Sequence, residues 1–527
     1  MNAPLPSPRL RHEIHHNRMV RCYASRPVDV FAMFETAVTR AAGETAAVDG
    51  DDRVTYTALA QRVAVCAAAW QRLGLRAGDR AALLLDNRID FLVALLAAAR
   101  LGVIAVPLNI RQKRPETAYA LNDSGAVLLV YERSLSGELP LTDEVPELHH
   151  RLIVDDTTHV WDDGHAGALV DTAPVGEDEP FCILYTSGTT GLPKGAVLTH
   201  LGTVSSCMAA HEHLGLQHGE TTILCVPASH VTGIILELLL MVRVAGKTVF
   251  QRGFKARRFL EEAAAERMSY VIMVPAMYTL CLMDADYDKF GLANWRVGAY
   301  GGAPMPDALL EDLARRQRGL ALHNIYGATE TTSPAVIMPA GEGFSRRTQV
   351  GRAVSCCDLL VMDEAGRELP PGEQGEIWMA GPMVIPRYWN NSKATEENFL
   401  GGYWKSGDIG TLDQAGYLRV HDRKKDMINR GGFKIYSVEV ENALMAHPAV
   451  LEAGVIGVPC PVLGERVKAY AVLREPASEA ALRNHCAERL SDYKVPDRIV
   501  ILDQALPRNA NGKLLKTALR ALDEAVS

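Results

Sequence analysis

Residues 185–195 read YTSGTTGLPKG, in which hydroxyl side chains and glycines lead up to one lysine, Lys194. The apolar residues Phe181, Ile183 and Leu184 precede this stretch and are typical of a buried strand. Glycines let backbone N–H groups approach a ligand, hydroxyls donate hydrogen bonds, and consecutive backbone donors bind anions. The stretch therefore predicts a phosphate-binding loop at the end of a strand, with a flexible linker as the alternative. The candidate phosphate ligands are Thr186, Ser187, Gly188, Thr189, Thr190, Gly191 and Lys194.

This loop differs from the nucleoside-triphosphate loop GxxxxGK[ST], because Lys194 follows Leu192 and Pro193 and is itself followed by Gly195. A different phosphate chemistry is needed. Five more polar motifs follow this loop along the chain. They are VPASHVTG (226–233), YGATETT (326–332), YWKSGDIG (403–410), DRKKDMINRGG (422–432) and PRNANGK (507–513).

Two carboxylates in these motifs, Glu330 and Asp408, suit polar or cationic ligands. Glu330 is a hard oxygen ligand of the kind that binds Mg²⁺ together with phosphate oxygens, and Thr186 and Thr329 could donate to the same oxygens. Asp408 offers two acceptor oxygens. Each carboxylate also has a purely structural interpretation, as a helix cap for Glu330 and as a turn residue for Asp408.

The elements that must position these motifs alternate along the chain. Helix-like stretches at 59–73 and 90–101 are each followed by a short aliphatic run, at 80–85 and 103–107, and the alternation continues to about residue 274. Strands separated by helices at this spacing predict layers of α/β structure with mostly parallel strands. After about residue 350 the pattern changes to short strands joined by turns, which predicts a small β-rich subdomain, and a compact α+β pattern starts at about residue 426.

Composition excludes several classes of protein. The chain has 527 residues, 22% of them charged, and a formal net charge of −8, so nothing in its charge indicates nucleic acid as a partner. No apolar run is long enough to predict a membrane span. The ten cysteines are scattered, which argues against a disulfide framework and favours a reducing compartment, here the cytoplasm. Residues 1–27 form a basic, histidine-rich N-terminal arm, in which a transit peptide or a metal site at His12, His15 and His16 are the alternatives.

Together, the six ordered motifs resemble those of the adenylate-forming superfamily, which contains acyl- and aryl-coenzyme A ligases, luciferases and the adenylation domains of peptide synthetases. The resemblance extends over about residues 28–520. It implies a large N-terminal adenylation domain at 28–424, with its β-rich subdomain at about 350–424. A small mobile C-terminal domain at 425–527 would rotate about a hinge at Lys425.

The same resemblance assigns the ATP site, with Glu330 as the metal ligand and with Thr186, Glu330, His230 and Lys513 as the catalytic residues. Lys513 looks like the mobile lysine that reaches the substrate carboxylate and the α-phosphate, although a lysine near a C-terminus is ordinarily solvated. Asp408 resembles the acid that accepts both ribose hydroxyls, with Arg423 nearby. The remaining residues of the implied adenosine and phosphate site are Gly302, Ala303, Pro304, Asn324, Tyr326, Gly327 and Thr329.

His230 resembles the histidine at the mouth of the acyl pocket, with a satisfied core histidine as the alternative. The other implied pocket residues are Val231, Thr232, Gly233, Ile272, Tyr300, Gly301 and Ala328. This set is small and mostly apolar with no second cation, so we expect an aryl or medium-chain monocarboxylate rather than a dicarboxylate.

For the thiol acceptor, the resemblance implies coenzyme A contacts at Gly431, Gly432, Tyr493 and Lys494. Some aryl-coenzyme A ligases have a tryptophan where Leu463 stands here. We therefore expect a free-standing ligase that uses ATP, Mg²⁺ and coenzyme A, with delivery of the acyl group to a separate carrier protein as the alternative. A homodimer is compatible with the sequence.

Overall fold

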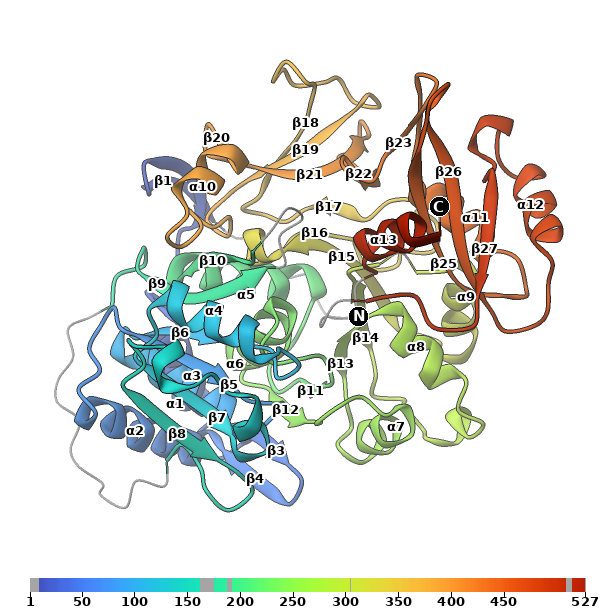
Figure 1. Cartoon of the computed structure of the whole chain (residues 1–527). Coiled ribbons are helices and arrows are strands. Elements are labelled where there is room, and N and C mark those ends of the chain that lie inside the picture. Colours follow the sequence, from blue (N-terminus) through green and yellow to red (C-terminus); the bar gives the residue numbers. More distant parts are fainter. Residues whose placement is uncertain (1–8, 162–174, 187–191, 304, 509–513, 527) are drawn as a thin grey trace. The chain divides into compact units, whose positions relative to one another are not determined.

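The computed structural model describes residues 9–161, 175–186, 192–303, 305–508 and 514–526 (Figure 1). The chain divides into two compact units, and each is described by itself. Unit 1 comprises residues 1–359 with 379–404, and unit 2 comprises residues 360–378 with 405–527. Unit 2 thus takes in part of the β-rich stretch together with the C-terminal residues, and the boundary at Lys425 stays a prediction.

Three groups of strands form the framework of unit 1, and most of them run parallel, as the alternating sequence predicts. The first sheet has the order β10-β9-β6-β5-β7-β8, in which only β10 is antiparallel to its neighbour. Its strands are β5 (Arg80–Leu84), β6 (Ile104–Pro107), β7 (Leu128–Glu132), β8 (His150–Val154), β9 (Pro180–Thr186) and β10 (Lys194–Thr199).

The second sheet has the order β11-β12-β3-β4, and the strands from β13 to β17 follow one another in sequence order. The bounds in the second sheet are β3 (Thr45–Asp49), β4 (Asp52–Thr55), β11 (Thr221–Leu224) and β12 (Lys247–Phe250). The third group consists of β13 (Tyr270–Met273), β14 (Val297–Gly301), β15 (Ala321–Ala328), β16 (Ser333–Ile337) and β17 (Gly351–Ala353). β13, β14 and β15 are parallel, whereas β16 and β17 return antiparallel.

Helices cover these sheets, and their ends follow from local sequence. Asp29, Thr55 and Thr199 each accept a backbone N–H at the start of a helix, and Gly102 ends α3 in the left-handed region. Almost every residue of α3 is buried, so this helix lies inside the core rather than on the surface. The helices of unit 1 are α1 (Val30–Ala41), α2 (Tyr56–Arg72), α3 (Ile89–Leu101), α4 (Arg114–Ser124), α5 (His200–Leu214), the π-helical segment η3 (Gly233–Leu239), α6 (Leu240–Arg243), α7 (Ala256–Ala265), α8 (Pro275–Leu282), α9 (Asp307–Arg316) and α10 (Ser392–Asn398).

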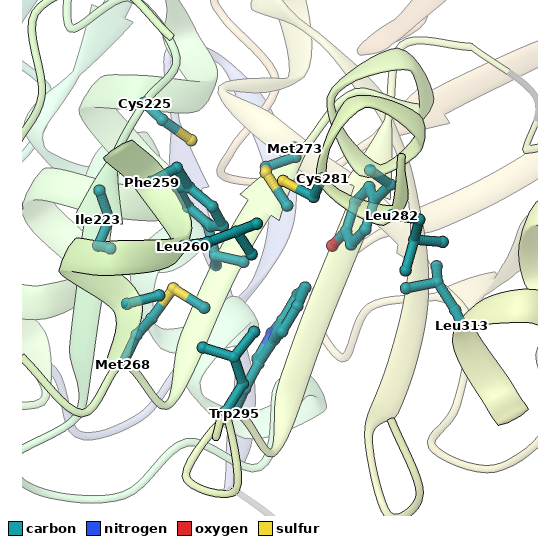
Figure 2. Close-up of a cluster of buried hydrophobic side chains, with 14 of the residues drawn as sticks. Ile223, Cys225, Phe259, Leu260, Met268, Met273, Cys281, Leu282, Trp295 and Leu313 are labelled. Atoms are coloured by element: carbon teal, nitrogen blue, oxygen red, sulfur yellow. The ribbon is translucent and has the colours of Figure 1, made fainter. Parts of the chain in front are cut away.

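A large hydrophobic core lies behind β11 and β13. Figure 2 shows Ile223 and Met273 from these strands meeting side chains from α7, α8 and α9, with Trp295 at one side of the cluster. Tyr278 stacks on Trp295 at a centroid distance of 5.9 Å. Burial of such large apolar groups fixes the strands that carry the candidate pocket residues.

Residues 10–23, which the sequence assigned to an arm, form a hairpin of β1 (Leu10–His15) and β2 (Arg18–Tyr23). Its two-residue turn has positive φ at His16 and Asn17, as the twist of a tight hairpin requires. Arg26, whose side chain is 5% exposed, binds Glu13 at 2.8 Å and Glu177 at 2.5 Å. These ion pairs hold the hairpin on unit 1. Glu13, His15 and Cys22 offer a potential metal cluster, but Arg26 already neutralises the carboxylate, which disfavours a cation there.

Unit 2 contains two sheets. In the first, β18 (Asp358–Met362), β19 (Gln374–Ala380), β21 (Tyr403–Leu412) and β22 (Tyr417–Arg423) have the order β22-β21-β19-β18. The short β20 (Phe399–Leu400) belongs to unit 1 and pairs with Tyr403 and Trp404, the first residues of β21, which belong to unit 1 as well. The second has the order β24-β23-β26-β25, with β27 parallel to β26. Its elements are β23 (Ile428–Arg430), β24 (Phe433–Ile435), β25 (Val450–Cys460), β26 (Gly464–Leu473) and β27 (Arg498–Leu502), with α11 (Ser437–Met445), α12 (Glu479–Ala487) and α13 (Lys516–Val526). The observed strands and helices confirm the predicted layered α/β region, β-rich part and α+β C-terminal part.

Candidate active site

The candidate phosphate loop connects β9 to β10, so it leaves the end of a strand as the sequence predicts. Thr186 and Lys194 face each other as the last pair of this antiparallel ladder, and the Thr186 hydroxyl lies 3.4 Å from the Lys194 carbonyl oxygen. Gly195 leaves no room for a side chain, because an added Cβ would lie 2.8 Å from Ile183. The residues between the two strands, Ser187, Gly188, Thr189, Thr190 and Gly191, lie outside the described part of the chain, as do Pro304 and Lys513.

Glu330 is connected to the loop lysine through a tyrosine that sequence reasoning missed. The Tyr388 hydroxyl donates to Glu330 Oε1 at 2.9 Å, and Lys194 Nζ lies 5.2 Å from the centroid of the Tyr388 ring. Burial, and then the neighbouring Glu330 charge, raise the pKa of Tyr388, so its hydroxyl stays a donor. The chain thus brings a cation, an aromatic ring and a carboxylate into one row.

The backbone around Glu330 is strained. Glu330 lies in the one-turn helix η5 (Thr329–Thr331), and the next two residues, Thr332 and Ser333, have positive φ of 48° and 80°. Non-glycine residues in this region cost free energy and are common at functional sites. The Thr332 hydroxyl donates to the Met383 carbonyl at 2.6 Å, which helps to hold the turn.

The candidate adenosine residues of unit 1 lie at the ends of neighbouring strands. Gly301 ends β14, and Asn324 and Tyr326 lie on β15, where Asn324 pairs with Tyr300. Gly302, which follows β14, has a φ of +76°, and Ala303 comes next. Gly327 has to be glycine, because a Cβ there would lie 1.8 Å from the Ser333 carbonyl oxygen. Ala328 ends β15, so these candidate residues lie on, or directly after, the two parallel strands β14 and β15, and the adenosine slot itself stays a prediction.

His230 and the helix that follows it build the candidate acyl pocket. His230 Nδ1 accepts the Thr232 backbone N–H at 3.3 Å, which leaves Nε2 as the protonated nitrogen. Burial lowers the pKa of His230 to about 4, so the ring is neutral at pH 7. Val231 is buried, and Gly233 packs so tightly that a Cβ would lie 2.3 Å from the Pro227 carbonyl oxygen. Ile272 is buried on β13 and Tyr300 on β14.

In unit 2, Asp408 and Arg423, which were expected to lie close together, form an ion pair. Asp408 on β21 is opposite Arg423 on β22, and Arg423 Nε lies 2.6 Å from Asp408 Oδ1. The Asp408 amide donates to the Ser406 hydroxyl at 3.0 Å, which fixes the strand at this point. The Asp408 side chain is only 9% exposed.

The residues assigned to coenzyme A come together in the second sheet of unit 2. Gly431 and Gly432 form the two-residue turn between β23 and β24 with φ of 59° and 91°. Phe433, directly after this turn and 57% exposed, stacks on Tyr493 at 4.6 Å. Lys494 Nζ is bound by Glu439 at 2.7 Å, so its charge is partly neutralised. Lys425, the predicted hinge, is exposed.

A polar cavity of about 740 Å³ in unit 1 is lined by none of the predicted residues. Arg88 Nε lies 2.9 Å from Asp90 in its wall, and Arg62 and Arg252 are paired with aspartates in the same way. Since these charges already neutralise one another, a phosphate would be a poor ligand for this cavity.

Comparison with known proteins decides the family. The model of the AMP-binding enzyme family matches residues 34–389, and that of the AMP-binding enzyme C-terminal domain matches residues 439–513. The chain belongs to the AMP-binding enzyme family. A feruloyl-CoA synthase from Amycolatopsis sp is 34% identical over 486 residues, covering 90% of this chain and 95% of the relative. A long-chain-fatty-acid–CoA ligase from Mycobacterium tuberculosis is 32% identical over 482 residues, covering 89% and 93%.

Among solved structures, o-succinylbenzoate coenzyme A synthetase from Bacillus subtilis is similar, with a TM-score of 0.84 and 31% identity over 93% of this chain. The match covers 97% of that synthetase in its complex with the acyl-adenylate intermediate and 99% in its complex with ATP and magnesium ion. This AMP-binding enzyme is therefore an AMP-forming acyl- or aryl-coenzyme A ligase with ATP, Mg²⁺ and coenzyme A as its cofactor and co-substrates. Glu330 fits the metal, because a carboxylate is the ligand type that Mg²⁺ takes beside phosphate oxygens. Among the described residues, we find no helix with the length and apolar character that crossing a bilayer requires.

Proposed function

We propose that this ligase activates an aryl or medium-chain monocarboxylic acid, first as the acyl-adenylate and then as the coenzyme A thioester. The relatives named as a feruloyl-CoA synthase and as a long-chain-fatty-acid–CoA ligase support an aryl or an aliphatic monocarboxylic acid as the substrate class. The small, mostly apolar pocket set supports it too, because a second buried carboxylate would need a cationic partner.

The row formed by Lys194, Tyr388 and Glu330 is the observation that carries the proposal. A carboxylate is a weak nucleophile that must approach a polyanion, so the attack requires neutralised charge and fixed orientation. Lys194 would bind the departing phosphates, and Glu330 would hold the magnesium ion. Thr186, at the start of the loop, would donate to the same phosphates.

His230 would orient the acid. Its Nε2–H has no acceptor among the described residues, whereas Nδ1 already accepts from the Thr232 amide. A neutral ring that donates one hydrogen bond can hold the carboxylate without protonating it, so the carboxylate remains a nucleophile. Lys513 would bridge this carboxylate and the α-phosphate, where its charge matches the charge that accumulates in the transition state.

Two further groups of candidate residues would bind the adenosine part of the nucleotide. The ring of Tyr326 would stack on the adenine beside Gly302, Ala303 and Asn324. Asp408, ion-paired with Arg423, would accept both ribose hydroxyls through its two oxygens.

For the second half-reaction, we propose that residues 425–527 rotate about Lys425 against residues 28–424. The pantetheine thiol would then pass the turn at Gly431 and Gly432, where backbone without side chains permits a close approach. Tyr493 would contribute an aromatic surface for the nucleotide of coenzyme A. Lys494 would contribute charge only if its pairing with Glu439 loosens.

A cytoplasmic location and a homodimer complete the proposal. All ten cysteines are free and buried, which suits a reducing compartment. Ile14 and Met19 are each 71% exposed as neighbours across the N-terminal hairpin and offer a small apolar surface to a second copy. Light scattering after size-exclusion chromatography would give the mass of a dimer, and a monomer at micromolar concentration would refute this part.

The proposed activity is tested by a screen of aryl, straight-chain and dicarboxylic acids, in which AMP and thioester are quantified with and without coenzyme A. We expect aryl or medium-chain monocarboxylates to give equal amounts of AMP and thioester. Adenylate formed at the same rate with and without coenzyme A, and without thioester, would instead favour a carrier protein as the acceptor. Preference for dicarboxylates would refute the proposed substrate class.

A further inference from the structure

Glu237 is a buried carboxyl group that the reaction described above does not use. It lies in the π-helical segment η3, seven residues after His230, and its side chain is fully buried. Neither carboxyl oxygen has a hydrogen-bond partner among the described residues. Burying a polar group without a partner is unfavourable, and π-helical turns occur frequently at functional sites.

Two more unpaired hydroxyls line the same side of the strands that η3 contacts. Thr222 on β11 and Tyr270 on β13 are fully buried, and neither hydroxyl has a partner in the described part of the chain. Side chains alternate along a strand, so both point away from the core to which Ile223 and Met273 contribute (Figure 2). The same alternation puts Ile272, a candidate pocket residue, on the side of Tyr270.

The charge properties of Glu237 agree with this placement. Burial raises the pKa of Glu237 well above its usual range, although the backbone N–H groups of Ile272 and Cys225, which lie nearby but outside hydrogen-bond geometry, favour its charged form. The contacts of η3 with β11 and β13 place Glu237 beside the strands that carry Thr222 and Tyr270, and burial also raises the pKa of Tyr270. The uncharged form that burial favours can both donate and accept a hydrogen bond.

We propose that Glu237 is a specificity-determining residue that hydrogen-bonds a hydroxyl group at the distal end of an aromatic acid substrate. This inference rests on the ligase activity and the His230 pocket proposed above. Glu237 lies seven residues after His230, which directly precedes the helical stretch, so about two helical turns separate them and they would meet opposite ends of a para-hydroxylated phenylpropenoic acid.

The chemistry of the carboxyl group sets the expected order of substrates. A distal hydroxyl satisfies the carboxyl group, whereas a hydrocarbon end leaves it unpaired. A distal carboxylate would bring a second anion to a buried acid and is the least favourable group. We therefore expect 4-hydroxycinnamate to be used better than cinnamate, and cinnamate better than 4-carboxycinnamate.

The test measures kcat/KM for thioester formation with these three acids in the wild-type enzyme and in the E237Q and E237L variants. We expect a preference of about 10-fold to 100-fold for 4-hydroxycinnamate over cinnamate in the wild type, the effect of one buried polar pair. E237Q, which keeps a donor and an acceptor, should retain most of the preference. E237L should bring the ratio close to one while cinnamate is still used.

The kcat/KM values for two acids are measured in the same protein sample, so a fraction of misfolded E237L protein lowers both values equally and does not change their ratio. An unchanged ratio in E237L, together with a lowered midpoint of thermal unfolding, would assign Glu237 a structural role and overturn the inference while the ligase activity stands. If no acid in the wider screen supports AMP release, the proposed function itself fails and this inference fails with it.

Discussion

Replacing Tyr388 by phenylalanine removes one hydroxyl and keeps the ring. The ring that remains in Y388F would still fill the buried site, pack against Phe399 at a centroid distance of 5.8 Å and lie 5.2 Å from Lys194 Nζ. The lost hydrogen bond, 2.9 Å long, has a carboxylate as its acceptor, and such bonds contribute about 1.5–3 kcal/mol. Since about 1.4 kcal/mol corresponds to a factor of ten, we expect kcat/KM for MgATP to fall by about 10-fold to 100-fold.

The assay is ATP–pyrophosphate exchange with an accepted acid as a function of magnesium concentration. Y388F should need more magnesium for half-maximal exchange, because Glu330 is no longer held in one orientation. The matched control is Y185F, which loses the bond from the Tyr185 hydroxyl to Asp123 Oδ2 at 2.6 Å. It should lose stability without a change in the magnesium requirement. If Y388F and the wild type have the same magnesium dependence, Tyr388 does not position Glu330 and the argument is refuted.

Three further predictions concern folding. R26M removes the buried cation that binds both Glu13 and Glu177, although Glu13 keeps its contacts with Arg11 and His15. It should lower the free energy of unfolding by about 3 kcal/mol in urea titrations, and an unchanged midpoint would contradict the role of these ion pairs. Burial lowers the pKa of His200 to about 4 in the folded protein, so the unfolded chain binds a proton at this residue at a higher pH than the folded chain does. The free energy of unfolding should therefore fall by on the order of 3 kcal/mol as the pH drops from about 6.5 to 4. H200Q should lose less stability over this pH range. A loss equal to that of the wild type would contradict the assignment of the pH dependence to His200. G327A should abolish ATP–pyrophosphate exchange and destabilise the fold, because its Cβ would lie 1.8 Å from the Ser333 carbonyl oxygen. The control G43A should be neutral, because an added Cβ has nothing within 4 Å. Exchange activity in G327A would show that the turn can relax and would contradict this prediction.

Features with a strong local signal could be predicted from the sequence. The alternation of helices with aliphatic runs predicted β5 and β6 to within one residue, because parallel strands buried on both faces are continuous apolar runs. The pairing of Asp408 with Arg423 was expected from the motif and is observed in the register of β21 and β22. The turn at Gly431 and Gly432 follows from glycine chemistry alone.

Features that depend on tertiary packing could not be predicted. The hairpin at residues 10–23 has charged and histidine side chains on its strands, so it lacks the apolar alternation that indicates a strand. Tyr388 lies more than 50 residues after Glu330, and only the folded chain brings them together. Glu237 belongs to none of the six motifs, and only the structure shows that it is buried in a π-helical turn.

The central claim, formation of AMP during acid activation, is tested most directly by ³¹P NMR of one complete reaction with an accepted acid, ATP, magnesium and coenzyme A. The account predicts one AMP and one pyrophosphate for each thioester formed, with no ADP. The appearance of ADP and inorganic phosphate in step with the thioester would contradict it.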